Sequence, residues 1–595
     1  MNATALALVD ADTDDADTLA DDALAELFGT TSATAPPLPP TGHIPDVWVS
    51  AYIRVLEASG VCEQVAAWLA EDRKATGPGG RPAVLTQKAV LVLLFILTHE
   101  HTPLLITRLA EVIEHRLSDT AKTLLGIPLA PATRTQWYHR IARTLHTLLD
   151  VIDPYPGPRN RLLTKNEHAA LLASRCPKTA ERKLARLDQV CNHIIESSVQ
   201  VQPRRLRRRW KGNACVDATL VRAFGKRGTT KRSDYVSIEY DAAWYVRDGD
   251  HRDPGDAKRR TIQKVHHGWE AVLVTQVTND PERDTGFPLL LVGMTFGKPG
   301  HDVAGTARRT FASIRERHHP AGYAMGDRAY FPNSTAEGLA LPLRALGYKL
   351  VFELRNDQLG ITASFAGAIQ VEGNWYCPEM PLPLIEATLD LRVRKTIDEA
   401  TWKVRIAQRT KYLLKPTERT DADGHTPMRC PAVGKSATVD CALRPGTVGV
   451  AAGGRPMITL TPTHPGRICI NRSSVSFPPT AGAKYAQDLQ FGTDEASSLF
   501  SSGRNTIEAA NAYLKDPNFH ALDDSGRRRV RGFAAQYLLV AFLVAAANIR
   551  KITAFVANER TETTATPKVA TSRRRDRLNS FFPTTPPTSA DPPAA

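Results

Sequence analysis

The chain has 595 residues, of which 42% are hydrophobic and 23% are charged, and its formal net charge is +14. This length and composition predict a soluble protein of two to four domains. They exclude a disulfide-rich scaffold, because only eight residues are cysteine, and we therefore expect a reducing compartment.

Acidic residues are concentrated at the N-terminus. Removing the nine acidic charges of residues 1–46 from +14 leaves +23 on the rest of the chain. A basic body favours a polyanionic partner, so we expect a surface that faces the phosphate backbone of DNA. The nine residues are Asp10, Asp12, Asp14, Asp15, Asp17, Asp21, Asp22, Glu26 and Asp46, and no Lys or Arg accompanies them.

Residues 1–45 are rich in Asp, Ala and Thr and end in a proline-rich stretch, which predicts a disordered acidic arm. The arm lacks a basic segment followed by an apolar core, so we do not expect it to be a signal peptide. Together with the basic body, this predicts a cytoplasmic protein associated with the nucleoid.

Residues 46–155 show the spacing of apolar residues that is typical of helices, for example from Trp137 to Ile152. Prolines divide the segment into short helices, which suits a helix-turn-helix-like domain that binds DNA ends. A plain helical bundle without a DNA role is the alternative for this segment.

Residues 156–211 are predicted to form a helical linker that ends in a dense basic cluster. Leu206 and Trp210 interrupt the cluster, and a strand-like segment follows it at once. We expect the cluster to contact DNA phosphates, although a solvated charged surface is the alternative. Its residues are Arg204, Arg205, Arg207, Arg208, Arg209 and Lys211.

Residues 212–358 alternate strand-like and helix-like patterns, which predicts an α/β fold with a mixed sheet. A helix is expected over 302–317, and another over 335–346 although Pro342 lies inside it. The strands are expected over 214–224, 242–247, 271–277, 289–295, 323–325 and 349–353.

Residues 359–490 contain short strand-like stretches between turns, which predicts a β-rich insertion. Helices over 501–515 and 528–555 complete the α/β domain as residues 491–556, and the basic, Pro- and Thr-rich tail at 557–595 is expected to be disordered. The apolar run from Phe533 to Ile549 falls short of the ~20 residues that span a bilayer. We therefore expect a buried helix and no membrane partner.

Three acidic residues stand out by their positions. Asp217 lies inside an apolar strand, and Asp327 follows a glycine at the end of another. Glu508 lies on a helix where, at ~100° per residue, Arg504 is about 40° and Lys515 about 20° away from it. When each acid is taken alone, the alternative is an edge strand for Asp217, a turn for Asp327 and an ordinary amphipathic helix for Glu508.

Taken together, the order strand-Asp, Gly-Asp-x-Ala-Tyr and helical Arg-x-x-x-Glu-x-x-x-x-x-x-Lys resembles the DDE transposases of bacterial insertion sequences. The resemblance covers about residues 211–551 and is strongest to the group with a large β insertion before the final Glu. In that group the signature begins with a Tyr three positions before the Arg, where this chain has Ser501. The resemblance implies an RNase H-like mixed sheet with flanking helices.

The resemblance also implies a function. Asp217, Asp327 and Glu508 are expected to hold two Mg²⁺ or Mn²⁺ ions for DNA cleavage and strand transfer, since carboxylates suit these ions. Arg504 and Lys515 are expected to contact phosphate near the scissile bond. The expected partners are double-stranded DNA, as element ends and as target, and further copies of the chain when DNA is bound.

This interpretation makes a geometric prediction. Asp217 should lie in the middle of the first strand of the mixed sheet, on the face that the Glu508 helix covers. Asp327 should lie at the end of the neighbouring strand, so that the three carboxylates converge. Arg504 and Lys515 should open onto the same groove.

The insertion also contains cysteine and histidine residues that suit zinc, which needs four thiolate or imidazole ligands. Cys430, Cys441 and Cys469 are the expected ligands of a structural zinc ion, and free or buried thiols are the alternative. Two other functions remain open. One is a stand-alone RNase H-like nuclease, and the other is a non-catalytic DNA-binding protein derived from a transposase.

Overall fold

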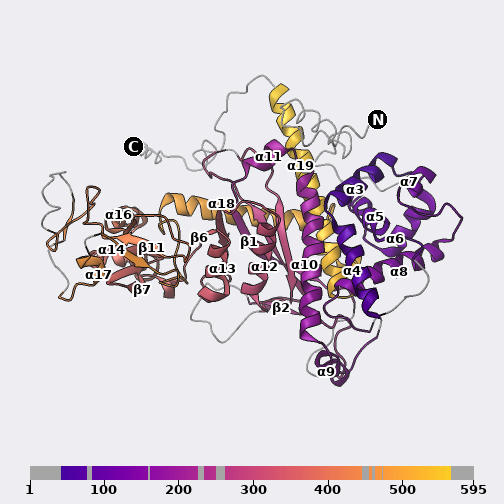
Figure 1. The fold of residues 1–595 in the computed structure, drawn as a ribbon, viewed down its shortest axis with the longest axis horizontal. Coiled ribbons are helices and arrows are strands. Elements are labelled where there is room, and N and C mark those ends of the chain that lie inside the picture. The colour runs from indigo at the N-terminus through magenta and orange to yellow at the C-terminus, as the bar shows by residue number, and fades with distance from the viewer. Residues whose placement is uncertain are drawn as a thin grey trace, which may run out of the picture.

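The computed structural model describes residues 42–76, 83–158, 161–225, 233–248, 262–283, 285–444, 455–458, 463–471 and 473–564. Most of the expected acidic arm and the tail beyond residue 564 lie outside these residues. The fold is mixed α/β. Figure 1 shows the N-terminal helices at one end, the main sheet in the middle and the insertion at the other end.

The N-terminal region is helical, as its sequence predicted. Three of its helices begin at a Ser or Thr whose side chain accepts a hydrogen bond from the third residue after it, namely Thr86, Ser118 and Thr133. Its α-helices are α3 (Asp46–Ala58), α4 (Val61–Thr76), α5 (Gln87–His99), α6 (Ile106–Glu111), α7 (Asp119–Leu124) and α8 (Arg134–Ile152), and a π-helical turn follows α6 at Val112–Arg116.

The segment expected to be a linker contains a core helix. After α9 (Lys165–Ala173), α10 (Pro177–Gln200) buries Leu187, Val190, Ile194 and other side chains at helical spacing. Buried Asn192 exchanges two hydrogen bonds, of 2.8 and 2.9 Å, with the backbone of Met294. The prediction of a linker was therefore wrong for α10, because one complete face of this helix packs inside the protein.

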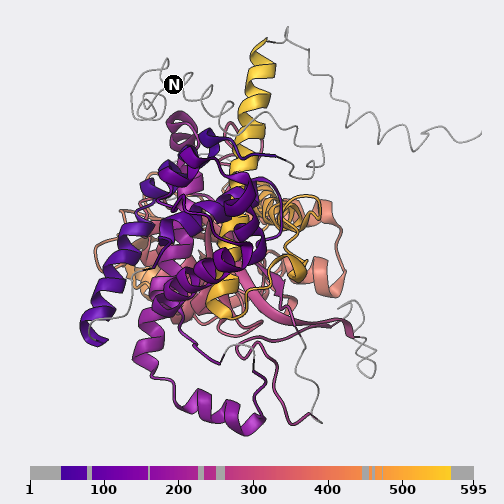
Figure 2. The ribbon, with the colours of Figure 1, turned by 90° about the vertical axis from the view of Figure 1, so that its right-hand side faces the viewer.

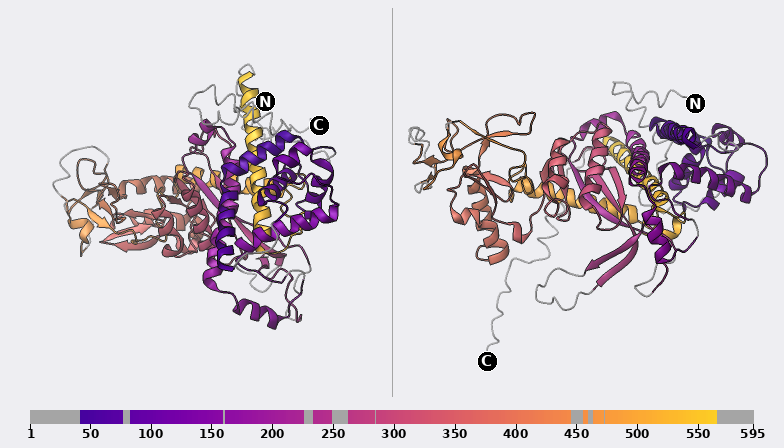
Figure 3. Two further views of the ribbon diagram at one scale, coloured as in Figure 1. Left: turned by 45° about the vertical axis from the view of Figure 1, so that its right-hand side comes forward. Right: turned by 60° about the horizontal axis from the view of Figure 1, so that its bottom comes forward.

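The main sheet contains six strands and is mixed. Its order is β2-β3-β1-β5-β6, and β4 pairs with β3. β3 is antiparallel to β1, β2 and β4, whereas β5 is parallel to β1 and β6. The strands are β1 (Ala214–Arg222), β2 (Ala243–Asp248), β3 (Ile262–Gln276), β4 (Leu291–Gly297), β5 (Tyr323–Gly326) and β6 (Lys349–Val351). β2 and the start of β3 extend away from the body (Figure 3).

Two helical segments follow the strands β4 and β5. α12 (Val303–Glu316) begins at Asp302, whose carboxylate accepts from the Gly305 N–H. The helix expected over 335–346 is instead a π-helical turn at Ala336–Ala340 followed by α13 (Leu341–Ala345). Pro342 lies in the first turn of α13, directly after the π-helical turn.

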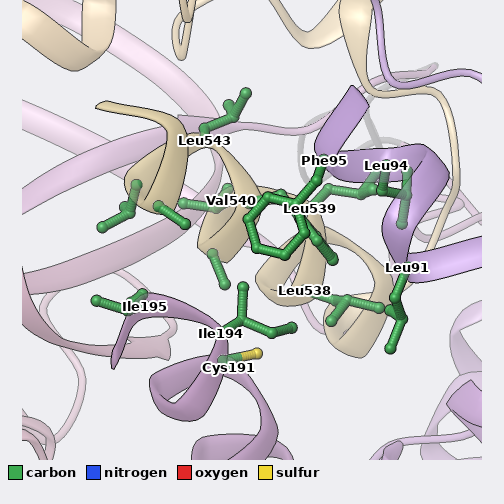
Figure 4. Packing of buried hydrophobic residues seen from close by; sticks show 14 of the residues in the cluster. Leu91, Leu94, Phe95, Cys191, Ile194, Ile195, Leu538, Leu539, Val540 and Leu543 are labelled. Carbon is green, nitrogen blue, oxygen red and sulfur yellow. The ribbon is translucent and has the colours of Figure 1, made fainter. Parts of the chain in front are cut away.

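Two long helices close the fold. α18 (Asp494–Lys515) begins seven residues before the predicted start, and α19 (Phe533–Thr564) continues past residue 557, where a disordered tail was expected. The C-terminal part of α19 extends beyond the rest of the molecule (Figure 2). Its N-terminal half packs against α5 and α10 (Figure 4), and the rings of Phe95 and Phe542 meet edge to face at 4.7 Å.

By length and composition the segment Phe533–Glu559, which continues past the apolar run at 533–549, could cross a bilayer. Most of the segment is buried against α5, α10 and β4. Its position in the core accounts for its apolar side chains.

The insertion contains short strands, as predicted, together with helices that were not predicted. α16 (Glu399–Arg409) buries Trp402, Ile406 and Arg409 at helical spacing and is capped by Asp398. The other helices are α14 (Leu382–Ile385), α15 (Ala387–Leu389) with a π-helical turn at Asp390–Arg394, and α17 (Arg467–Ile470). The strands are β7 (Ile361–Phe365), β8 (Ala368–Val371), β9 (Asn374–Tyr376), β10 (Lys415–Pro416), β11 (Thr426–Arg429), β12 (Asp440–Cys441), β13 (Met457–Ile458) and β14 (Val475–Phe477).

A buried carboxyl beside the main sheet predicts a pH-dependent stability. Glu239 is 3% exposed, and its Oε2 accepts from the Gly532 N–H at 2.9 Å. Burial raises the pKa of Glu239 from 4.5 to about 7. The folded protein therefore holds a proton that the unfolded chain has lost, and stability falls as the pH rises between these values.

We expect Glu239→Gln to raise the free energy of unfolding by about 3 kcal/mol at pH 8 and by much less at pH 5. Urea unfolding at the two pH values measures the difference. Glu337→Gln removes an exposed carboxylate and serves as the control. An equal effect of Glu239→Gln at both pH values would contradict a raised pKa.

Candidate active site

Asp217 and Asp327 lie beside each other on parallel strands. Asp217 is the fourth residue of β1, and Val216 before it pairs with Gly326, the last residue of β5. Asp217 directly follows Val216 and Asp327 directly follows Gly326, so the two acids are neighbours on adjacent parallel strands. This placement, one acid inside the first strand and one at the end of its neighbour, agrees with the geometric prediction.

α18 covers the face of the sheet that carries Asp217 and crosses β1, β3 and β5. Gly503 lies at the closest approach, where an added Cβ would stand 2.7 Å from the Met325 sulfur and 3.5 Å from the Cys215 Cβ. Since Cys215 and Asp217 lie on the same face of β1, the next turns of α18 pass directly over Asp217. A larger residue at position 503 would push the helix away from the acids.

The guanidinium of Arg504 joins two of the three acids. Its Nη1 lies 3.7 Å from Asp217 Oδ2, and its Nη2 donates to Glu508 Oε1 at 2.9 Å. Asn511, one turn further along α18, donates from Nδ2 to Asp217 Oδ2 at 3.4 Å. Asp217 and Arg504 are mostly buried, whereas the Glu508 side chain is 61% exposed.

The charges of the site perturb one another. Burial raises the pKa of Asp217, and the negative charges of Asp327 and Glu508 add to this effect, while Arg504 opposes it. Burial disfavours the charged form of Arg504, but its carboxylate neighbours, which include all three acids, outweigh burial and raise its pKa. Residues separated by 110 and 181 positions in the chain therefore form one electrostatic cluster.

The donor set fits hard divalent cations in its chemistry. It consists of three carboxylates and the Asn511 Oδ1 atom, which is buried and accepts no hydrogen bond among the described residues. In the part of the chain that the structure describes, no three acidic, His or Cys side chains already stand together at metal-ligand distances. Arg504 lies between Asp217 and Glu508 instead, so cation binding requires its guanidinium to leave this position.

Other expected DNA contacts lie around this centre. Lys515 ends α18 on the same helical face as Arg504 and Glu508. A groove of about 560 Å³ runs along a different face of α18, where Ser501, Asn505 and Thr506 face Lys551 of α19. Arg504 and Lys515 do not line this groove, which is separate from the helical face that carries the three charged residues.

The basic cluster forms α11 (Arg204–Arg209) and the residues after it. Arg205 and Arg209 lie 3.1 and 3.7 Å from Glu559 of α19, and Arg209 also donates to the Gly286 carbonyl at 2.6 Å. Arg208, Arg209 and Lys211 are exposed. The cluster is therefore anchored to α19, and part of it remains open to solvent.

Sequence reasoning missed Asn511 and Gly503. The spacing of Asn511, three residues after Glu508 and seven after Arg504, places it on their helical face and could have identified it. The role of Gly503 depends on the distance between α18 and the sheet, and no local pattern indicates that distance.

No protein family matches this chain, and no curated protein or solved structure matches it either.

Proposed function

We propose that this protein is a DDE-type transposase that cleaves DNA at the ends of a mobile element and joins those ends to target DNA. The observation that carries the proposal is that Arg504 pairs with Asp217 and Glu508, while Asp327 lies beside Asp217 on the neighbouring strand and its charge acts on both Asp217 and Arg504. Solvated surface acids seldom gather in this way, because like charges repel. We further propose that the mixed sheet is RNase H-like.

In this proposal Asp217, Asp327 and Glu508 hold two Mg²⁺ or Mn²⁺ ions. When bound, the ions neutralise charge on the scissile phosphate and lower the pKa of the attacking water or 3′-hydroxyl. Asn511 orients the Asp217 carboxylate through its hydrogen bond. Burial of Asp217 excludes water from one side of the carboxylate and thereby strengthens its attraction for a cation.

Arg504 has two roles in the proposal. Without cations its guanidinium balances Asp217 and Glu508, which keeps the acids from repelling one another. If the acids held cations, Arg504 would no longer be needed to balance them, and its planar donors would suit a DNA phosphate. Lys515 and the exposed residues of the α11 cluster extend this basic surface along the DNA.

The remaining expectations follow as part of the same proposal. The N-terminal helices α3–α8 bind the element ends, and the chain assembles into an oligomer on DNA. It works in the cytoplasm, at the nucleoid.

The test is a cleavage assay with the full-length protein and DNA that carries the sequences flanking its gene. We expect Mg²⁺ or Mn²⁺ to support nicking at the element ends, and we expect EDTA to stop it, because the donor set is oxygen only. Cleavage without preference for the ends would identify a stand-alone nuclease. Specific DNA binding without any cleavage would identify a non-catalytic DNA-binding protein, and cleavage in excess EDTA would exclude the two-metal site.

A further inference from the structure

Four of the eight cysteines lie in the insertion, and the structure brings all four into one buried cluster. Cys377, Cys430, Cys441 and Cys469 are 4–8% exposed and belong to the same hydrophobic core. All four are free thiols. They come from four separate segments spread over 93 positions, so the fold, and not the local sequence, gathers them.

Two of these cysteines occupy turns of the same design. In Cys377-Pro-Glu-Met and in Cys430-Pro-Ala-Val, the carbonyl of the cysteine accepts from the N–H three residues later, at 3.1 Å in both turns. The N–H of the residue two positions after each cysteine, Glu379 or Ala432, donates to the thiol sulfur. Such N–H donors stabilise a thiolate, which is the form that binds metal.

Hydrogen bonds to backbone carbonyls join these turns to one another. The N–H of Cys377 donates to the Tyr412 carbonyl at 2.9 Å, and the hydroxyl of Thr438 donates to Lys411, the residue before Tyr412. The N–H of Thr438 donates to the Pro431 carbonyl at 2.9 Å, next to Cys430. Cys377 and Cys430 are thus held on one framework.

The other two cysteines are joined through Arg444. The Arg444 N–H closes a turn on the Cys441 carbonyl at 2.8 Å, and its guanidinium donates to the Asn471 carbonyl, two residues after Cys469. These two hydrogen bonds hold Arg444 between the segments that carry Cys441 and Cys469.

We propose that Cys377, Cys430, Cys441 and Cys469 bind one zinc ion as a structural site that holds the insertion together. Four thiolates from separate turns are the ligand set of a closed tetrahedral zinc site. The sequence indicated three of these ligands, and the fold supplies Cys377 as the fourth. Binding releases the four thiol protons and leaves a site of net charge −2, which Arg444 partly balances.

The surroundings explain why the insertion needs such a site. The strands of the insertion are two to five residues long, and β12 and β13 pair over two residues only. Elements this short contribute few backbone hydrogen bonds, and a metal is one of the usual ways to stabilise a small core. Among the described residues the thiols do not yet stand at the mutual distances of a loaded site, so zinc must draw them together.

The experiment measures zinc in the full-length protein, purified without chelators from zinc-supplemented cells, by elemental analysis. We expect one zinc per chain, and we expect Cys377→Ser and Cys430→Ser each to lose most of it. Cys62→Ser and Cys176→Ser change cysteines outside the cluster and should keep one zinc. Cys377→Ser is the sharper variant, because only the three-dimensional cluster assigns this residue to the site.

A second measurement does not depend on how well the variants fold. Exchange of the bound metal for Co²⁺ in the wild-type protein should give the intense visible bands and the sulfur charge-transfer band of a tetrahedral thiolate site. The proposal would be overturned if the wild-type protein bound neither metal and its four thiols all reacted with a thiol reagent or formed a disulfide. DNA cleavage is not part of either readout, so the zinc site and the proposed function stand or fall separately.

Discussion

Replacing Asp217, Asp327 or Glu508 by its amide should lower metal-dependent DNA cleavage by about 10³-fold or more in each case. A divalent ion contributes several kcal/mol to the transition state of phosphoryl transfer, and about 4 kcal/mol corresponds to this factor. Each substitution removes one negative ligand while it preserves the shape of the side chain. The measurement is the single-turnover nicking rate on element-end DNA in Mg²⁺.

Glu495→Gln is the matched control, because Glu495 is an exposed acid on the same helix as Glu508 and lies in its first turn, away from the cluster. Its cleavage rate should equal that of the wild type. DNA binding should persist in all four variants, since the acids do not contact phosphate in the proposed site. A wild-type rate in any one amide variant removes that residue from the site.

The stability of Asp217→Asn provides an independent check. Burial raises the pKa of Asp217, so its charged form is disfavoured in the folded protein without cations. At pH values above the ordinary carboxyl pKa, the charge of Asp217 costs the folded protein most. In that pH range we expect the amide variant to have the same free energy of unfolding as the wild type, or a higher one. A loss of cleavage in a variant that remains fully folded separates chemistry from misfolding.

Removing Arg409 should have the largest effect on stability, about 3–5 kcal/mol for Arg409→Met. Arg409 and Glu372 are both fully buried in the insertion and form an ion pair of 2.5 Å. Arg409 also donates to the carbonyls of Leu384 and Ile385, and Thr388 donates to the same Glu372 oxygen at 2.9 Å. The substitution leaves a buried carboxylate without its counter-charge, and two carbonyls lose their donors.

Arg405→Met is the matched control for this experiment. Arg405 lies one turn earlier on α16 and pairs with Asp390 at 2.8 Å, with partial exposure to solvent. Its loss should cost less than about 1 kcal/mol, since solvent replaces the interaction. Chemical unfolding, followed by a probe in the insertion, measures both variants. Equal effects of the two substitutions would show that burial of the Arg409–Glu372 pair carries no extra stability.

The sequence by itself determined the elements whose pattern is strong and local. They include the apolar strand around Asp217, the strand that leads to Asp327 and the helix that carries Glu508. The predicted ends of these elements lie within a few residues of the observed ends, except at the start of α18. Hydrophobic periodicity reports which side of an element is buried, and this is a local property. The order of the three acids in the chain was sufficient to suggest their chemistry.

The tertiary structure alone decided what depends on distances between segments. It placed Arg504 between Asp217 and Glu508, assigned Asn511 to Asp217 and gathered Cys377 with three distant cysteines. It also made α10 a core helix and gave the insertion a buried ion pair. The physical reason is the same in each case. The energy of a buried charge, a buried thiol or a close contact between helices depends on its neighbours in the folded protein. Those neighbours lie many residues away in the chain.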